Sequence, residues 1–83
     1  MPRYFIDTHD DDMLVKDEDG MEFADADEAR EAALAALPDM VRDKVRDGTD
    51  RTFCASVRDE AGTVLFKATL ALTGQRGPGL KPC

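Results

Sequence analysis

Two runs of alternating apolar and polar residues, separated by a short turn-forming segment, constrain the fold of this chain most strongly. From 51 to 59, and again from 64 to 72, apolar residues occupy every second position. This period of two is typical of β-strands that bury one face. Residues 60–63 between the runs include Gly62, which can take the positive φ that a tight turn demands. The pattern therefore predicts a β-hairpin with one apolar face.

The clearest helix signal begins at Asp25. Asp25 and Glu28 have the spacing of a capping box, and acidic residues in a first helical turn interact favourably with the helix dipole. At about 100° per residue, one broad sector collects an apolar stripe suited to packing on a sheet. The stripe comprises Ala26, Ala29, Ala33, Leu34, Leu37, Met40, Val41 and Val45. We therefore expect a helix whose alanines let its backbone approach the sheet closely.

Pro38 lies inside this helical pattern. A proline there removes one helical hydrogen bond and crowds the carbonyl of Leu34, at a cost of about 3 kcal/mol in an ordinary helix interior. Either the helix kinks at Pro38 or a second helix begins there. The apolar stripe keeps its phase beyond Pro38, which favours a kinked helix that continues to the region of Arg46, and Gly48 then supplies the stop signal.

The segment before the helix predicts a second, shorter hairpin. Residues 3–7 are rich in aromatic and β-branched types, and the acidic residues 8–12 have a turn composition. A short apolar run over 13–15, closed by the polar residues 16–20, indicates a strand paired with the first. The chain thus predicts an α+β fold of the type ββαββ, an antiparallel sheet of about four strands with one helix across one face.

Composition limits this fold to one hydrophobic core. A chain of 83 residues buries about 60% of the surface that its unfolded form exposes. We place the domain at residues 1–73, because residues 74–83 are dominated by glycine and proline and predict a flexible tail.

Cys54 and Cys83 make neither a disulfide framework nor a spaced metal site, so we expect reduced thiols and a cytoplasmic protein. No apolar run approaches the roughly 18 residues that span a bilayer, so no membrane association is expected.

The net charge of −7 is distributed unevenly along the chain. Residues 1–31 hold 12 of the 18 acidic and 3 of the 11 basic residues and carry −9, whereas residues 32–83 carry +2. This acidity argues against nucleic-acid binding through phosphates, which requires lysine and arginine gathered on one face. It favours solubility and repels anionic partners.

Several short segments together resemble a known family. They are the start Pro2–Asp7, the Gly20, Glu22 and Phe23 segment before the helix, the alanine-rich helix, and the Val57–Gly62 turn. Through these segments, residues 1–73 resemble a family of small alphaproteobacterial proteins known only as a domain of unknown function. The resemblance implies a bacterial, cytoplasmic, single-domain protein and carries over no activity, cofactor or catalytic residue. Pro38 and the tail 74–83 depart from the family's pattern.

The acidic segment after the first predicted strand is the candidate metal site. The candidate ligands are Asp7, His9 and Asp11, with Asp10 and Asp12 beside them. A calcium loop of the EF-hand type needs glycine at its sixth position and glutamate at its twelfth. Counted from Asp7, the twelfth residue is Glu18 but the sixth is Asp12, so the required glycine is missing. Either these residues bind a divalent cation or, as we favour, they form a solvated acidic turn.

We predict no enzymatic activity and no cofactor. His9 is the only histidine and lies in a predicted exposed loop beside acidic residues, where an ordinary loop histidine is a simpler interpretation than a general base. Cys54 falls on the sheet face opposite the core, and Arg58, four residues away, is too distant along a strand to activate its thiol. No serine or cysteine has a recognisable nucleophile context.

The sheet face opposite the helix gives the leading functional hypothesis. One helix covers only one face of such a sheet, and the apolar residues expected on the other face are Phe5, Met13 or Leu14, Cys54, Leu65 and Ala71. An apolar patch there predicts self-association or a partner, although scattered surface apolar residues are also ordinary in monomers. We therefore expect a non-enzymatic protein-interaction or regulatory module, a homodimer, whose acidic first third selects a basic partner surface.

Two other functions stay open at this point. The first is a divalent-cation-binding protein that uses the Asp7–Asp12 loop. The second is a mimic of nucleic-acid charge that occupies the binding groove of a basic protein. The mimic requires acidic residues along one surface at roughly the separation of phosphates, and the alternation of acids in the loop and first helical turn does not establish that arrangement.

Overall fold

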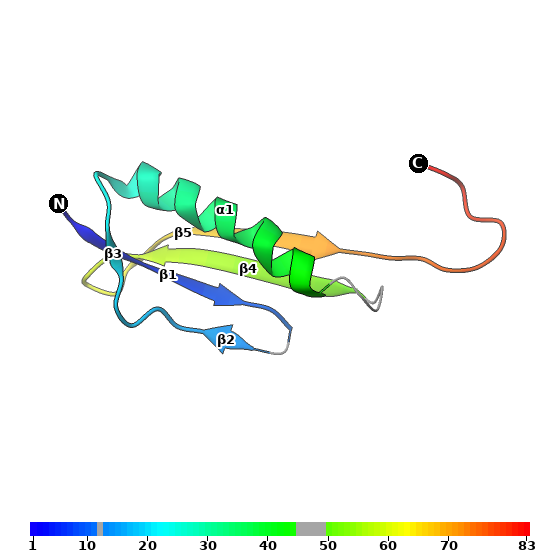
Figure 1. Cartoon of the computed structure of the whole chain (residues 1–83), viewed down its shortest axis with the longest axis horizontal. Coiled ribbons are helices and arrows are strands. Elements are labelled where there is room, and N and C mark those ends of the chain that lie inside the picture. The colour runs from blue at the N-terminus through cyan, green and yellow to red at the C-terminus, as the bar shows by residue number, and fades with distance from the viewer. Residues whose placement is uncertain (12, 45–49) are drawn as a thin grey trace.

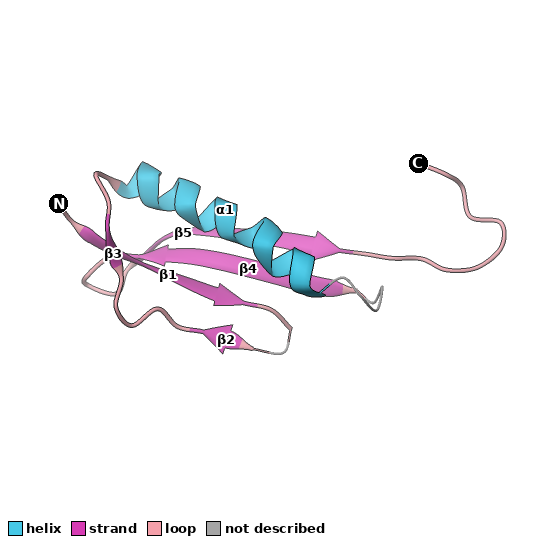
Figure 2. Ribbon diagram, viewed as in Figure 1, coloured by secondary structure: helices cyan, strands magenta, loops and turns pink. Residues whose placement is uncertain are grey.

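One helix packs across one face of an antiparallel sheet in the computed structural model, which describes residues 1–11, 13–44 and 50–83 (Figure 1). In chain order the elements are β1 (Arg3–His9), β2 (Leu14–Val15), β3 (Met21–Glu22), α1 (Ala26–Lys44), β4 (Arg51–Arg58) and β5 (Val64–Leu72). Figure 2 shows the two layers, with α1 on one side of the strands. The fold class is α+β, as the sequence predicts.

The sheet has five strands, in the order β2-β1-β4-β5, with β3 also paired to β1. Every pairing is antiparallel. The two short strands pair with opposite ends of β1, since His9 lies opposite Leu14 and Arg3 lies opposite Glu22. The sequence prediction of about four strands misses β3, because a strand of two residues offers no alternation to detect.

β1 extends further than its sequence predicts. Thr8 and His9, which were expected in the acidic loop, belong to the strand and pair with Ala55 and Cys54 of β4. Cross-strand pairing with a central strand outweighs the weak turn preference of these two residues. The acidic loop therefore begins only at Asp10.

The helix begins where its capping residues indicate. The Oδ1 atom of Asp25 accepts a hydrogen bond from the Glu28 N–H at 2.9 Å, which is the expected cap of the first turn. Pro38 lies inside α1, so the helix continues through it and no second helix begins at that residue. A kink at Pro38 stays a prediction. The predicted end near Arg46 and the stop at Gly48 lie outside the described residues.

The long hairpin predicted over 51–72 is confirmed by β4 and β5. Their ladder places Phe53 opposite Leu70 and shifts register only at the end of β4 nearest the turn. In the turn, the Asp59 Oδ1 atom accepts a hydrogen bond from the Thr63 N–H at 2.9 Å. Gly62 has a φ of 87°, the left-handed value for which glycine is favoured.

The hydrophobic core lies between α1 and β4. It consists of Phe23, Ala29, Ala33, Leu37, Phe53, Ala55 and Val57. Two residues assigned to the buried helical stripe, Ala26 and Leu34, are exposed instead. The predicted stripe is wider than the sheet surface that α1 covers. The helix lies mainly over β4, and in the described sheet β5 is the last strand beyond β4. Leu34 therefore stays 41% exposed.

The chain leaves the sheet after β5. Residues 73–83 form no helix or strand and run away from the sheet (Figure 1). The Gly74 N–H donates a hydrogen bond to Asp50 Oδ1 at 3.1 Å, which holds the beginning of this segment near the start of β4. Within the described residues, no helix combines the length and apolar character needed to cross a membrane.

Candidate functional site

Asp7 and Arg58 form an ion pair on the sheet face opposite α1. The Asp7 Oδ2 atom accepts a hydrogen bond from Arg58 Nε at 2.6 Å, and Oδ1 accepts one from Nη2 at 3.1 Å. The two side chains are only 16% and 19% exposed. The guanidinium also lies 4.8 Å from the centre of the Phe5 ring, opposite Arg58 in the ladder. β1 and β4 are thus joined by a bidentate contact in addition to their backbone ladder.

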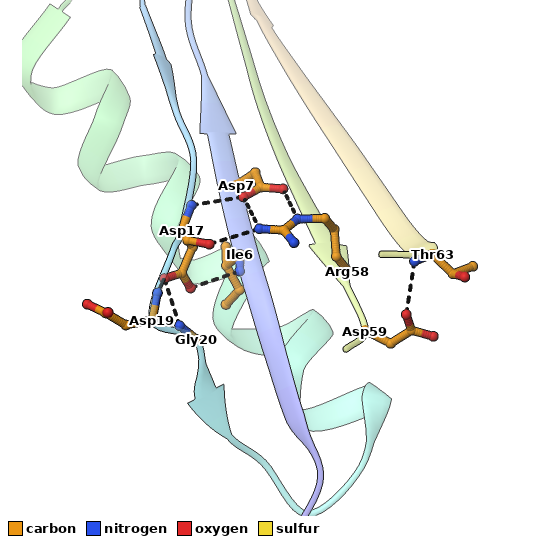
Figure 3. A network of polar contacts seen from close by, with 8 residues as sticks. All are labelled: Ile6, Asp7, Asp17, Asp19, Gly20, Arg58, Asp59 and Thr63. Carbon is orange, nitrogen blue, oxygen red and sulfur yellow. Dashed lines mark hydrogen bonds and ion pairs between the residues drawn. The ribbon is translucent and has the colours of Figure 1, made fainter. Parts of the chain in front are cut away.

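Asp17 ties the segment between β2 and β3 to β1 (Figure 3). Its carboxylate accepts hydrogen bonds from the N–H groups of Ile6 at 3.1 Å, Asp19 at 3.2 Å and Gly20 at 2.9 Å. Its own N–H donates to Asp7 Oδ1 at 2.9 Å, and its carbonyl oxygen accepts from Arg58 Nη2 at 2.8 Å. The Asp17 side chain therefore takes the place of a strand partner for the middle of β1.

Gly20 permits this segment to lie close to β1. Its φ is 70°, and a Cβ atom at this position would lie 2.8 Å from the Phe5 ring. Any other residue would meet both an unfavourable backbone conformation and a steric clash. The close approach covers one side of Phe5 while Arg58 lies near its ring, so Phe5 is half-buried although α1 is on the opposite face.

The surroundings of both carboxyl groups lower their pKa values. The hydrogen-bonded Arg58 guanidinium holds the pKa of Asp7 below its ordinary value of 3.8, against partial burial, which raises it. Partial burial also raises the pKa of Asp17, but the N–H donors outweigh this effect and its pKa again lies below 3.8. Asp7 in turn raises the pKa of Arg58. All three groups are therefore charged at neutral pH.

We expect acid to destabilise the fold through Asp7 and Asp17. Their folded pKa values lie below the unfolded value of 3.8, so their contribution to the free energy of unfolding is complete above that value and is lost as pH falls through the folded pKa values. Asp17→Asn removes one of these titrating groups. The stability difference between wild type and Asp17→Asn should therefore be constant above about pH 5 and shrink as pH falls through about 4 and below, as measured by urea unfolding. A difference independent of pH would contradict this assignment.

The structure places the three candidate metal ligands in separate surroundings. Asp7 pairs with Arg58, His9 is exposed at the end of β1, and the Asp11 Oδ2 atom accepts a hydrogen bond from the Thr52 N–H at 3.1 Å. Within residues 1–11, 13–44 and 50–83, no group of three or more histidine, cysteine, aspartate or glutamate side chains is placed to hold a metal ion. Asp12 lies outside the described residues.

The favoured alternative, a solvated acidic turn, is wrong for Asp10. Asp10 is only 8% exposed, and its Oδ1 atom accepts a hydrogen bond from the Met13 N–H at 2.8 Å. Its own N–H donates to the Met13 carbonyl oxygen at 3.0 Å, which closes the turn between β1 and β2. Asp7, Asp10 and Asp17 are therefore structural acceptors for N–H groups, a role that aspartate commonly takes in turns.

Polar residues interrupt the apolar face expected on the open side of the sheet. The ladder places Phe5, Leu14, Cys54 and Ala71 on this face, and the register shift near the turn also brings Val64 onto it, opposite Arg58, and leaves Leu65 outside the ladder. However, a row formed by Asp7, Ser56 and Lys67 crosses it from β1 to β5. The apolar residues that the ladder places on this face are consequently interspersed with polar ones.

The two edges of the sheet differ sharply. On one side, β2 and β3 are two residues long each, and Asp17 covers the Ile6 N–H between them. Short strands, charges and side-chain caps are the features that protect natural edge strands from pairing with another chain. On the other side, β5 runs for nine residues and, among the described strands, pairs only with β4. Lys67 is its only charged residue.

The direction of the β5 backbone groups follows from contacts made by β4. The Thr52 N–H donates a hydrogen bond to the Oδ2 atom of Asp11, which follows the end of β1. The backbone N–H and C=O groups of even-numbered β4 residues therefore point toward β1. Backbone groups alternate in direction along a strand, so odd-numbered residues of β4 point toward β5, where Ala55 lies opposite Ala68. Even-numbered residues of β5 thus bond to β4. The alternation does not extend through the register shift between Val57 and Arg58, where Val64 lies opposite Arg58. The outward N–H and C=O groups, which we call the β5 edge, belong to Lys67, Thr69 and Ala71.

Exposed apolar side chains surround the β5 edge. Val64, Leu65 and Leu70 on β5 are 57%, 47% and 39% exposed. On α1, the Arg30 guanidinium lies 5.8 Å from the centre of the Phe66 ring of β5, which identifies the helix flank that faces this strand. Leu34 lies one turn further along the same flank. The sequence prediction of an interaction surface on the open sheet face stays a prediction, and alternation alone could not show which strand would be left at the edge.

These features define a small α+β module with one closed and one open sheet edge. A family model described as a domain of unknown function (DUF6894) matches residues 3–71, so the chain belongs to this family. Neither a curated protein nor a solved structure matches the chain.

Proposed function

We propose that this chain is a non-enzymatic protein-interaction module that binds another polypeptide along the β5 edge. The observation that carries the proposal is the contrast between the two sheet edges. The Asp17 contacts and the short strands β2 and β3 close one edge, whereas β5 presents nine residues with one charge. An added strand would satisfy the outward backbone groups, and the exposed side chains of Val64, Leu65 and Leu70 would be covered.

The acidity of the chain sets which partners approach it. The first 31 residues carry −9 and form β1, β2, β3 and the start of α1, and β1, β2 and β3 lie on the other side of β4 from β5. Their field attracts a basic polypeptide and repels nucleic acid and other polyanions. The proposal therefore favours a partner with a basic surface next to the segment that adds to β5.

The contacts of the acidic residues support our preference for this function over cation binding. Asp7 accepts hydrogen bonds from Arg58 and from the Asp17 N–H, and Asp11 accepts one from the Thr52 N–H. A divalent cation at Asp7 would have to replace a bidentate guanidinium that lies beside it already. No contact in the described residues favours the cation function over the interaction function.

Thr69→Pro is the sharpest test of strand addition. Proline at this position removes one outward N–H of the β5 edge and places its ring against any added strand, while the inward bonds of β5 to β4 stay intact. We expect peptides selected from a displayed random library to bind the wild-type chain and to lose at least about tenfold in affinity for Thr69→Pro. Selected peptides should carry net positive charge, and their binding should weaken as salt is added.

Gln75→Pro is the matched control, because Gln75 is exposed and lies in no strand. It should bind the selected peptides as the wild type does. Thermal unfolding of both variants shows whether either substitution disturbs the fold. Peptides that bind wild type and a folded Thr69→Pro equally well would rule out the β5 edge as the binding element.

A further inference from the structure

We infer that the segment added along the β5 edge carries an acidic side chain opposite Lys67, with an apolar residue on either side of it in the sequence of that segment. The inference rests on the proposed function and deepens it by naming the side chains of the bound segment. In strand addition, backbone hydrogen bonds supply affinity and alternate side chains supply specificity. Lys67 is the only charged residue of β5, so charge discriminates between segments at this position of the edge.

The ammonium group of Lys67 is available to a bound carboxylate. Lys67 lies on the open face of the sheet, opposite Ser56 of β4, which in turn lies opposite Asp7 of β1. It is exposed, and among the described residues no hydrogen bond or ion pair engages its side chain. Asp7, the acid of the same row, is two strands and thus about 10 Å away. Its carboxylate is already paired with Arg58, so it leaves the charge of Lys67 uncompensated.

The outward backbone groups of Lys67 determine where the acidic side chain lies. Because these groups point away from β4, they are the ones that bond to an added strand. The residue paired with Lys67 then projects its side chain to the open face as well, whichever direction the added strand runs. Directly opposite side chains on neighbouring strands have Cβ atoms about 5 Å apart, which is within reach of an ion pair.

The two residues that flank this acidic position project to the helix side of the sheet. There they meet the apolar row of β5 that lies opposite the core residues of β4, which includes Phe66, Ala68 and Leu70. Ala68 is the smallest side chain of this row, so a large apolar residue opposite it also reaches its diagonal neighbours. Leu70 is 39% exposed, and Leu34, on the flank of α1 that faces β5, is 41% exposed. Apolar flanking residues would cover both side chains.

An acidic residue at one position is compatible with a segment that is basic overall. The acids of β1, β2 and β3 act from the other side of β4, and those at the start of α1 act from the helix side, whereas Lys67 lies on the open face. The summed field of these acids attracts the net charge of a whole segment over about a Debye length. Lys67 acts on the one side chain opposite it. The expected segment is therefore acidic only where it faces Lys67.

Charge reversal at Lys67 tests this assignment. Peptides selected from a displayed random library against the wild-type chain should align on an aspartate or glutamate between two apolar residues. Selection against Lys67→Glu should replace that acid with lysine or arginine, and Lys67→Gln should select neither charge. A selected peptide whose acid is changed to lysine should bind Lys67→Glu at least about fivefold more tightly than it binds the wild type. This difference should shrink as salt is added.

Lys81→Glu is the matched control, because it makes the same change of net charge at an exposed residue that lies in no strand. It should select the same peptides as the wild type, which separates the contact at Lys67 from the overall charge of the chain. Thermal unfolding of each variant shows that the fold is kept.

The inference and the proposed function fail in different ways. Peptides that lose affinity for Thr69→Pro but have no acid between apolar residues, or keep that acid when selected against Lys67→Glu, would overturn the inference and leave strand addition standing. Peptides that bind a folded Thr69→Pro as tightly as the wild type would overturn strand addition and the inference with it. A library that yields no binding peptide would have the same consequence.

Discussion

Phe53→Ala is expected to lower the free energy of unfolding by about 3–5 kcal/mol, the largest effect of any single substitution considered for this chain. Phe53 is 0% exposed and lies in the core cluster with Ala55, Val57 and the buried alanines of α1. Loss of its ring removes buried apolar surface and leaves a cavity that neighbouring alanines are too small to fill. Because small domains are stable by only about 5–15 kcal/mol, much of the variant should be unfolded at physiological temperature.

Leu14→Ala is the control for this substitution. Leu14 belongs to the short strand β2 and is 67% exposed, so its truncation should change stability by no more than about 0.5 kcal/mol. Urea unfolding followed by circular dichroism measures both variants on one scale. Similar losses for Phe53→Ala and Leu14→Ala would mean that the core does not lie between α1 and β4.

Asp17→Ala is expected to destabilise the fold by about 2 kcal/mol, because three backbone N–H groups lose their acceptor. The contacts to Ile6 and Gly20 are partly buried, and the contact to Asp19 is exposed. The first two should account for most of the loss. For a domain of this size the expected fall in melting temperature is on the order of 10 °C. The Ile6 N–H should also exchange with solvent much faster, since none of the described strands covers the middle of β1 on this side.

Asp17→Asn separates the acceptor role from the charge of this residue. Its amide oxygen can still accept from Asp19 and Gly20, but its NH₂ group cannot accept the Ile6 N–H. It should therefore be less damaging than Asp17→Ala while still exposing Ile6. If Asp17→Ala melted like the wild type, the side chain would not be the cap that closes the β2 and β3 edge, and the contrast between the two edges would lose its basis.

The candidate site could be read from the sequence only in part. Asp7, Asp10 and Asp11 stand out as an acidic run, but the run does not reveal that each side chain has a different partner. Arg58 is 51 residues from Asp7 along the chain. Alternation puts both residues on the face opposite the core, and only the pairing of β1 with β4 brings them together. Asp17 sits in a polar run with no pattern, so nothing in the sequence distinguished it from Glu18 or Asp19.

The sequence by itself determined the elements whose signals are local. The β4–β5 hairpin follows from alternation and from a four-residue turn, and the start of α1 follows from Asp25 and Glu28. The signals for such elements lie within a few neighbouring residues, so they can be recognised without knowledge of the rest of the chain. The tertiary structure alone decided the order of the strands, the length of β1 and the edge left open by β5. Those properties depend on which distant backbone groups find each other, because hydrogen bonding in a sheet joins residues whose separation along the chain carries no periodic signal.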